Sequence, residues 1–260
     1  LPITDPASGY VESGFSTADE VRGYDWEGEY NDDKVTAAGT YNMYCHREPR
    51  FYTTISFNNA WFCSEKRRYD FLMNGADNPH THDAPQNGYL LRKKVSPESI
   101  IIENNIKYRP GIICRLAEAY LNYAEALVEC GETTQEVLDY VNRIRVRAGV
   151  RPYTFGATDD NNIHVDADQS ALRNIIRMER RVELCCEGLR YNDLRRWKEA
   201  ETVLNGPFYG MNYNGTNAST FYQRTVYQTR VYHKSYYWFP IHQSELDKNE
   251  NLVQNPYWAE

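Results

Sequence analysis

Apolar and polar positions follow a helical period in the segment around residues 112–131. The apolar residues of this segment recur at intervals of three or four positions: Leu116, Tyr120, Tyr123 and Leu127. This spacing predicts the buried face of an amphipathic helix, because positions three or four apart share one side of it. Gly131 then supplies a stop signal.

A second helical pattern follows at once. Thr133 and Glu136 are spaced as a capping box, in which two side chains satisfy backbone N–H groups at a helix start. The next apolar stripe consists of Val137, Val141, Ile144 and Ala148, and it ends at Gly149 and Pro152. We therefore predict two antiparallel helices joined by a short turn. Such a hairpin, of the tetratricopeptide kind, buries its faces by stacking on neighbours.

A further helical block begins near Asp168, a suitable N-cap residue, and continues to Gly188. Helical character resumes in "RYNDLRRWKEAETVL" as far as about Leu204. The later segments "FYQRTVYQTRVYHKS" and "YYWFPI" are rich in Tyr, Val and Thr with partial alternation, which predicts a β-hairpin formed by these two segments. For the tail, residues 242–258, we predict one more helical turn and then an extended end.

Residues 1–110 show little helical periodicity and many Gly, Pro, Asn and Ser positions. Residues 50–58, "RFYTTISFN", read as a short strand between long irregular segments. We expect a mostly α protein in which tetratricopeptide-like hairpins pack against a loop-rich region with a few short strands. Residues 1–110 would form the loop-rich ligand face and residues 111–260 the helical scaffold with its C-terminal hairpin, as one integrated domain.

The stretch "ERRVELCCEGLRYNDLRRW", residues 179–197, is dense in both acids and arginines. We expect its charged side chains to form a structural ion network, with Arg196 also facing the acids; the members are Glu179, Arg180, Glu183, Glu187, Arg190, Asp193 and Arg195. Neighbouring arginines stabilise ionised carboxylates and lower their pKa, whereas a catalytic general acid needs a raised pKa. A structural role is therefore favoured over catalysis.

The amino-acid composition limits the classes of partner and ligand that we expect. The chain has 29 basic and 36 acidic residues, a net charge of −7 and no basic stripe, so nucleic acid is not an expected partner. No run of 18 apolar residues is present, and the first ten residues lack a signal-peptide pattern. The six cysteines lack metal-site spacing, and His80, His82 and Asp83 read as a solvated loop, so we expect neither metal nor cofactor.

The aromatic content is high, with 22 Tyr, 9 Phe and 5 Trp in an otherwise polar chain. Exposed aromatic rings beside amide groups suit the apolar C–H faces and hydroxyls of sugars. Three clusters in the loop-rich region are candidates for contact with such a ligand: Trp61 and Phe62 with Asn58 and Asn59, then Tyr41 and Tyr44, then Tyr24 and Trp26.

Several blocks of sequence occur in an order that resembles the C-terminal half of the SusD/RagB family. These are "REPRFYTTISFNNAW", "GYLLRKKV", "RLAEAYLNYAEAL", "VLDYVNRIRVRAGV", "ERRVELCCEGLRYNDLRRW" and "YYWFPIHQSELDKNENLVQNP". The resemblance implies a non-catalytic, surface-exposed lipoprotein of the outer membrane in Bacteroidetes. Such a protein captures oligosaccharide for import through a SusC-like TonB-dependent transporter, and its lipid anchor would lie outside this chain.

Three alternatives stay open. Some members of the resembled family bind peptides instead of glycans. A glycoside hydrolase could use a carboxylate pair outside the charged helix, such as Asp25 with Glu27 or Asp32 with Asp33. A helical interaction scaffold is the third, although one detectable hairpin gives it little support.

Overall fold

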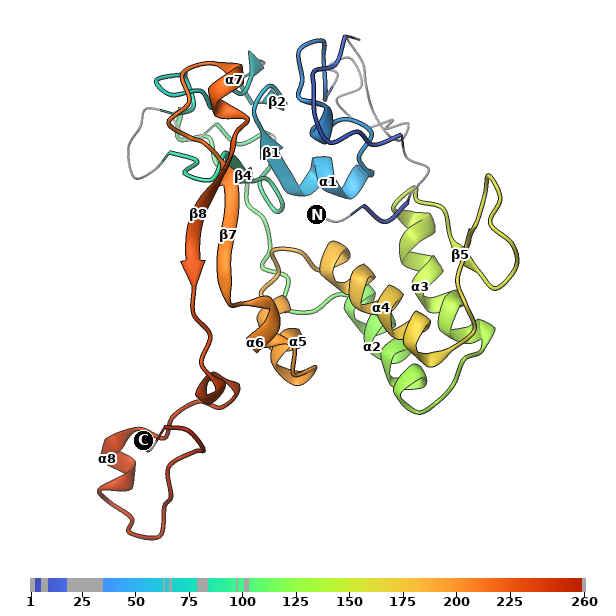
Figure 1. Ribbon diagram of the computed structural model, residues 1–260, viewed down its shortest axis with the longest axis vertical. Coiled ribbons are helices and arrows are strands. Elements are labelled where there is room, and N and C mark those ends of the chain that lie inside the picture. Colours follow the sequence, from blue (N-terminus) through green and yellow to red (C-terminus); the bar gives the residue numbers. More distant parts are fainter. Residues whose placement is uncertain are drawn as a thin grey trace.

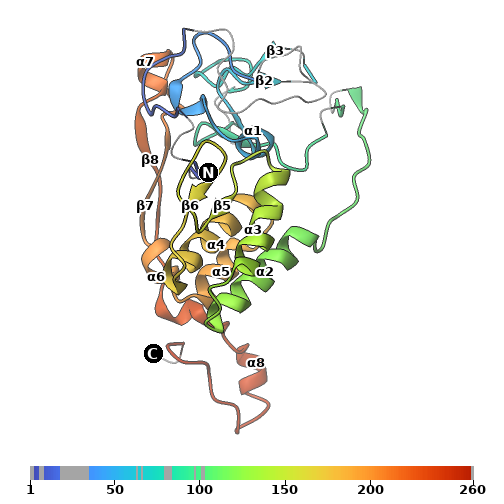
Figure 2. The same ribbon diagram turned by 90° about the vertical axis from the view of Figure 1, so that its right-hand side faces the viewer.

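The computed structural model describes residues 3–5, 9–17, 35–62, 64–65, 67–78, 84–96, 98–100 and 103–258. Its scaffold is built from three helices, α2 (Leu116–Glu129), α3 (Gln135–Arg147) and α4 (Gln169–Glu183). In Figure 1 the loop-rich part lies above these helices. Figure 2, turned by 90°, shows α2 and α3 facing the viewer. The protein is mostly helical with a few short strands, as the sequence predicts.

The scaffold helices start and stop where local chemistry allows. The Asp168 side chain accepts hydrogen bonds from the backbone N–H groups of Ser170 and Ala171 and so caps α4, as predicted. Gly131 and Gly149 adopt φ angles of 92° and 68° just beyond α2 and α3. The predicted capping box is wrong, because the N-cap of α3 is Thr134 and no side chain bonds there.

The scaffold core lies between α2, α3 and α4. Its fully buried residues are Ala124, Val128, Val137, Leu138, Val141, Leu172 and Ile176. A second, smaller cluster joins Leu121 to Ile144 and Leu184 at the other end of the helices.

The predicted buried face of α2 is wrong by one residue. Leu121, Ala124 and Val128 face the core, whereas Leu116 is 63% exposed and Tyr123 is 43% exposed. The helix carries two adjacent apolar stripes, and the stripe with alanines is buried because small side chains allow neighbouring helices to pack closely. Leu116 and Tyr123 of the other stripe therefore lie on the outer surface, whereas Tyr120 and Leu127 are half-buried against the edges of the two clusters.

The loop-rich part has an aromatic core of its own. Its buried members are Tyr44, Phe51, Tyr52, Phe57, Ala60, Phe71, Met211 and Phe221. The predicted strand 50–58 is only partly correct, because α1 (Pro49–Thr54) precedes β1 (Ile55–Phe57). Pro49 occupies the first turn of α1, where its fixed φ suits a helix and its missing N–H costs nothing.

The part of the chain that the structure describes also contains four small two-stranded sheets. β1 pairs with β4 (Tyr89–Leu91), and β2 (Trp61–Phe62) pairs with β3 (Arg67–Arg68), both antiparallel. β5 (Tyr153–Thr154) and β6 (Ile163–His164) are parallel. β7 (Gly206–Met211) and β8 (Arg224–Arg230) form an antiparallel ribbon with an irregularity between Phe208 and Tyr209.

This ribbon corrects the predicted C-terminal hairpin. The partner of β8 is β7, which precedes it, and the segment "YYWFPI" begins in a 3₁₀ helix, η3 (Lys234–Tyr237). Between the strands lies α7 (Ala218–Phe221), whose Phe221 inserts into the aromatic core. In both views the ribbon connects the loop-rich end with the region of α6.

The helical stretch predicted after Gly188 forms two short helices. It forms α5 (Arg190–Arg196) and α6 (Ala200–Val203), with Lys198 at φ 60° between them. The remaining elements are η1 (Asn42–Tyr44) and α8 (Gln243–Leu246), which supplies the predicted last helical turn. Within the described residues, no helix combines the length and apolar character needed to cross a bilayer.

The two faces of α2 predict different responses to truncation. Leu121→Ala removes a fully buried side chain and should lower the free energy of unfolding by about 2–5 kcal/mol. Leu116→Ala, on the exposed stripe, should change it by about 0.5 kcal/mol or less. Urea unfolding followed by circular dichroism measures both, and equal losses would contradict the observed face.

Candidate ligand-binding site

The end of α4 is surrounded by basic side chains from distant parts of the chain. Glu179 is fully buried and forms ion pairs with Arg50 of α1 at 2.8 Å and Arg145 of α3 at 3.0 Å. Arg145 is equally buried, its guanidinium lies 4.0 Å from the centre of the Tyr153 ring, and it donates to the Arg151 carbonyl. One carboxylate therefore links α1, α3 and α4.

Glu183, the last residue of α4, is paired from three sides. Arg115 approaches its carboxylate at 2.5 Å and Arg50 at 3.3 Å, and Arg147 also pairs with it. Burial alone would raise the pKa of Glu183, but Arg115, Arg147 and Arg50 outweigh it and hold that pKa below its usual value. Glu183 is thus kept ionised.

Glu187 and the last carbonyls of α4 are bound by the same cations. Arg115 contacts the Glu187 carboxylate at 2.7 and 2.8 Å, and Lys93 contacts it at 2.6 Å. Lys93 also donates to the backbone carbonyls of Glu183 and Cys185, and Arg115 donates to the Glu183 carbonyl. These groups satisfy carbonyls left free at a helix end, where the helix dipole favours cations.

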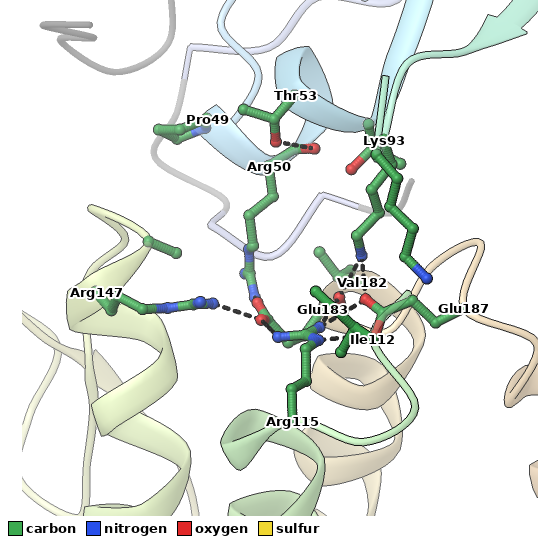
Figure 3. A pocket seen from close by; sticks show the side chains of 13 residues that line it. Pro49, Arg50, Thr53, Lys93, Ile112, Arg115, Arg147, Val182, Glu183 and Glu187 are labelled. Atoms are coloured by element: carbon green, nitrogen blue, oxygen red, sulfur yellow. Dashed lines mark hydrogen bonds and ion pairs between the residues drawn. The ribbon is translucent and has the colours of Figure 1, made fainter. Parts of the chain in front are cut away.

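Figure 3 shows these groups around a hollow of about 480 Å³ between α1, the start of α2 and the ends of α3 and α4. Two of the acids that the sequence singles out, Glu183 and Glu187, line it, together with Arg50, Arg115 and Arg147. For Glu187 too, burial is outweighed by the bonds from Arg115 and Lys93, which lower its pKa. Neither acid is set up to donate a proton as a general acid.

A second group of ion pairs joins α2, α4 and α5. Arg180 binds Asp193 through two hydrogen bonds of 3.0 and 2.9 Å. Arg196 binds the buried Glu125 through two bonds of 2.5 and 2.6 Å, and the Trp197 indole donates to the same carboxylate at 2.6 Å. Bidentate arginine pairs of this kind fix orientation as well as charge.

Arg190 and Arg195 do not take the expected places in this network. The Arg195 guanidinium donates to the Tyr237 carbonyl at 2.6 Å and lies 4.5 Å from the Phe239 ring centre. Arg190 lies 5.7 Å from the Trp197 ring centre. The cations that replace them, such as Lys93 and Arg145, come from segments far away in sequence, where no local pattern marks them.

The aromatic residues predicted to contact a ligand differ in how deeply they are buried. Tyr44 is 1% exposed and belongs to the aromatic core, so it cannot stack on a ligand from solvent. Trp61 and Phe62 are half-buried on β2, with Phe62 stacked 4.3 Å from Tyr69. Arg68 lies 5.6 Å from the Trp61 ring centre, and the buried indole N–H has no hydrogen-bond partner among the described residues.

The side chains of the two candidate asparagines form hydrogen bonds within the protein. Asn58 donates to the Tyr222 hydroxyl at 2.9 Å and accepts from the Phe71 backbone at 2.8 Å. Asn59 has a φ of 70° and donates to the Thr40 hydroxyl at 3.0 Å. Both amides therefore shape the loops. Tyr24 and Trp26 lie outside the described residues.

Three rings form a small aromatic surface that the sequence does not reveal. Tyr41 stacks on Tyr222 with ring centres 4.3 Å apart and planes 10° from parallel. Phe15 packs edge-on against both rings at 5.4 Å and is 44% exposed. We call Phe15, Tyr41 and Tyr222 the Phe15 face. Its members are 26 to 207 positions apart in the chain, so only the fold brings them together.

Among the residues that the structure describes, no three His, Cys, Asp or Glu side chains gather as a metal site would require. His80, His82 and Asp83 lie outside those residues, as do Asp25, Glu27, Asp32 and Asp33.

Comparison with known proteins identifies the family. A model of the SusD family matches residues 8–258. The chain belongs to the SusD family. SusD-like protein P2 of Formosa agariphila (strain DSM 15362) is 34% identical over 153 residues, which cover 59% of this chain and 26% of that protein.

Solved SusD-like structures share the fold. The structure named BT4246 superposes with a TM-score of 0.70 at 26% identity, over 98% of this chain and 42% of the other. A SusD-like carbohydrate-binding protein (BF0978) from Bacteroides fragilis NCTC 9343 gives a TM-score of 0.64 at 27% identity, over 92% of this chain and 46% of that one. The chain thus spans less than half of the length of these relatives.

The ion pairs of α4 predict a strong effect of removing one charge. Glu179→Gln leaves Arg145 buried without its carboxylate and removes one of the three carboxylates around Arg50, so it should cost about 3–5 kcal/mol of unfolding free energy. The matched change Glu129→Gln, which breaks a largely exposed pair with Arg173, should cost no more than about 1 kcal/mol. Chemical denaturation would contradict the network if both variants lost equally little.

The lowered pKa values of Glu183 and Glu187 predict acid sensitivity. Their stabilising contribution is complete above the unfolded-state pKa of about 4.3 and is lost as the pH falls through the lower folded-state pKa values. The melting temperature should therefore fall steeply below about pH 4.3. Glu183→Gln should melt lower than wild type at pH 7 and lose less between pH 5 and 3. Parallel pH profiles would argue against this assignment.

Proposed function

We propose that this protein is a non-catalytic, cell-surface glycan-binding protein that delivers oligosaccharide to a SusC-like TonB-dependent transporter in the outer membrane. SusD-family proteins are carbohydrate-binding proteins of the cell surface, and this chain belongs to that family. The observation on this chain that favours binding is the Phe15 face, a partly exposed aromatic surface held on a rigid aromatic core.

The Phe15 face has the properties that sugar recognition requires. Tyr41 and Tyr222 are fixed by mutual stacking, so a ligand that packs on them orders few side chains. Tyr222 is also held by Asn58, and Phe15 projects beside both rings. Trp61 and Phe62 on β2, both half-buried, are proposed as a further ligand contact of the loop-rich part through the exposed parts of their rings.

The acid–base chemistry of the site favours binding over hydrolysis. A glycosidase needs one carboxyl group with a raised pKa, and the pKa values of Glu183 and Glu187 are lowered by their basic neighbours. A reducing-sugar assay with a broad polysaccharide set tests the alternative directly. Sustained release of reducing ends would overturn the non-catalytic proposal.

We further propose that residues 1–110 and 111–260 act as one integrated domain. Arg50 of α1 pairs with Glu179 and Glu183 of α4, and Lys93 binds the end of the same helix. A ligand bound on the loops would thus rest on the scaffold directly.

The Phe15 face predicts a separable loss of binding. Phe15→Ala should weaken oligosaccharide affinity by about tenfold or more, because it removes the exposed ring of the surface, and leave the fold intact. Titration calorimetry against neutral and acidic oligosaccharides and peptides measures this. Tyr108→Ala, which removes an exposed ring outside the face, is the matched control. If no oligosaccharide bound, or if both variants bound equally well, the proposed site would be wrong.

A further inference from the structure

A second hollow, of about 570 Å³, lies between α5 and the end of β8. Its lining includes Arg190, Tyr191, Thr229, Arg230 and Tyr232. It shares no lining residue with the hollow beside α4, and none of its lining belongs to the Phe15 face. In Figure 1, α5 and the lower end of β8 lie at the opposite end of the ribbon from the loop-rich part. The volume is within the range of sites that hold small ligands.

Tyr232 lines this hollow and carries a buried hydroxyl. The residue is 6% exposed and packs with Leu194 and Ala200, yet its hydroxyl is buried and has no hydrogen-bond partner among the described residues. The ring centre of Tyr191 stands 6.3 Å away, and burial together with this neighbouring tyrosine raises the pKa of Tyr232 to about 12. A buried hydroxyl without a partner costs free energy, and a ligand that hydrogen-bonds to it recovers that cost.

Arg190 supplies a cation without a protein anion. Its half-buried guanidinium has neither an ion pair nor a hydrogen bond among the described residues, and it lies 5.7 Å from the centre of the Trp197 ring. Burial and the nearby Arg181 lower its pKa, and the more distant carboxylates of Glu199 and Asp193 offset this only in part. Six positions later on the same helix, Arg196 binds two carboxylates. An anionic ligand group at Arg190 would therefore compensate a charge that the fold leaves unmatched.

The rest of the lining suits a sugar ring. Tyr191 is 42% exposed and offers an aromatic face for C–H groups. Gln228 and Thr229 offer hydrogen-bonding groups, although Gln228 already accepts from Arg230. Arg230 brings a second positive charge to the rim, beside the Phe208 ring.

We propose that this hollow binds a carboxylate-bearing sugar unit, a uronate, within an oligosaccharide. The carboxylate pairs with Arg190, with Arg230 nearby. The ring packs on Tyr191, and a sugar hydroxyl or ring oxygen bonds to the Tyr232 hydroxyl. The inference rests on the proposed function and deepens it, because it assigns an acidic class of glycan to a site separate from the Phe15 face.

Titration calorimetry with trigalacturonate and the neutral maltotriose tests the assignment. Wild type should bind the uronate at least about tenfold more tightly, because a charge-assisted bond to arginine is made only by the acid. Arg190→Gln should remove that preference and leave maltotriose affinity unchanged. Arg109→Gln, which removes an exposed arginine elsewhere, is the control of equal charge and should behave as wild type.

Tyr232→Phe separates binding from folding. It removes one oxygen atom that has no partner in the free protein, so the melting temperature should stay equal or rise. Affinity for trigalacturonate should nevertheless fall about threefold to tenfold. A drop in melting temperature with unchanged affinity would show that the hydroxyl serves the fold, and would overturn its assigned role.

The outcomes distinguish this inference from the proposed function. If neither sugar class bound to any extent, the glycan-binding function itself would fail. If maltotriose and trigalacturonate bound equally, with Phe15→Ala weakening both and Arg190→Gln neither, the function would stand and the uronate site would be rejected.

Discussion

The buried ion pairs of Glu179 are the constraint on which the rest of this structure depends. Its carboxylate is out of contact with water and is shared by Arg50 from the loop-rich part and Arg145 from α3. A buried charge is tolerated only while its partners stay in place, so α1, α3 and α4 must keep their relative positions together. Glu183 and Glu187 extend the same condition to the segments that carry Lys93 and Arg115. The scaffold thereby fixes the irregular loops that a hydrophobic core alone would specify less well.

The ion-paired carboxylates are also distinct from the groups that we propose bind a ligand. Carboxylates held by several arginines stay ionised and occupied, so they offer a ligand neither a proton nor a free acceptor. We therefore propose that recognition falls to groups that the fold leaves exposed or unpaired. The Phe15 face offers stacked rings, and the hollow beside α5 offers Arg190 and Tyr232. The carboxylates of residues 179–197 therefore serve the fold, and the proposed ligand groups are the Phe15 face and the lining of the hollow beside α5.

The sequence predicts the parts of this fold that depend on near neighbours in the chain. Helical spacing locates α2, α3 and α4, and the Asp168 cap follows from its own side chain. The buried face of α2 could not be predicted, because two apolar stripes differ only in which neighbour they meet. The partner of β8 could not be predicted either, since β7 begins at Gly206 and carries Pro207, a weak strand signal. The acids at the end of α4 are visible in sequence, but their partners Lys93, Arg115 and Arg145 depend on tertiary packing.

Arg190 and Arg196 show why charge pattern alone does not assign roles. Both lie on the short helix α5, and both contact the Trp197 ring. Arg196 faces Glu125 and Asp193 and completes the network, whereas Arg190, on another side of the helix, meets no carboxylate at hydrogen-bond distance. The difference comes from the neighbours that tertiary packing brings to each side of the helix. A half-buried cation without a direct ion pair keeps its capacity to bind an anion, which is why we propose Arg190 as a recognition group.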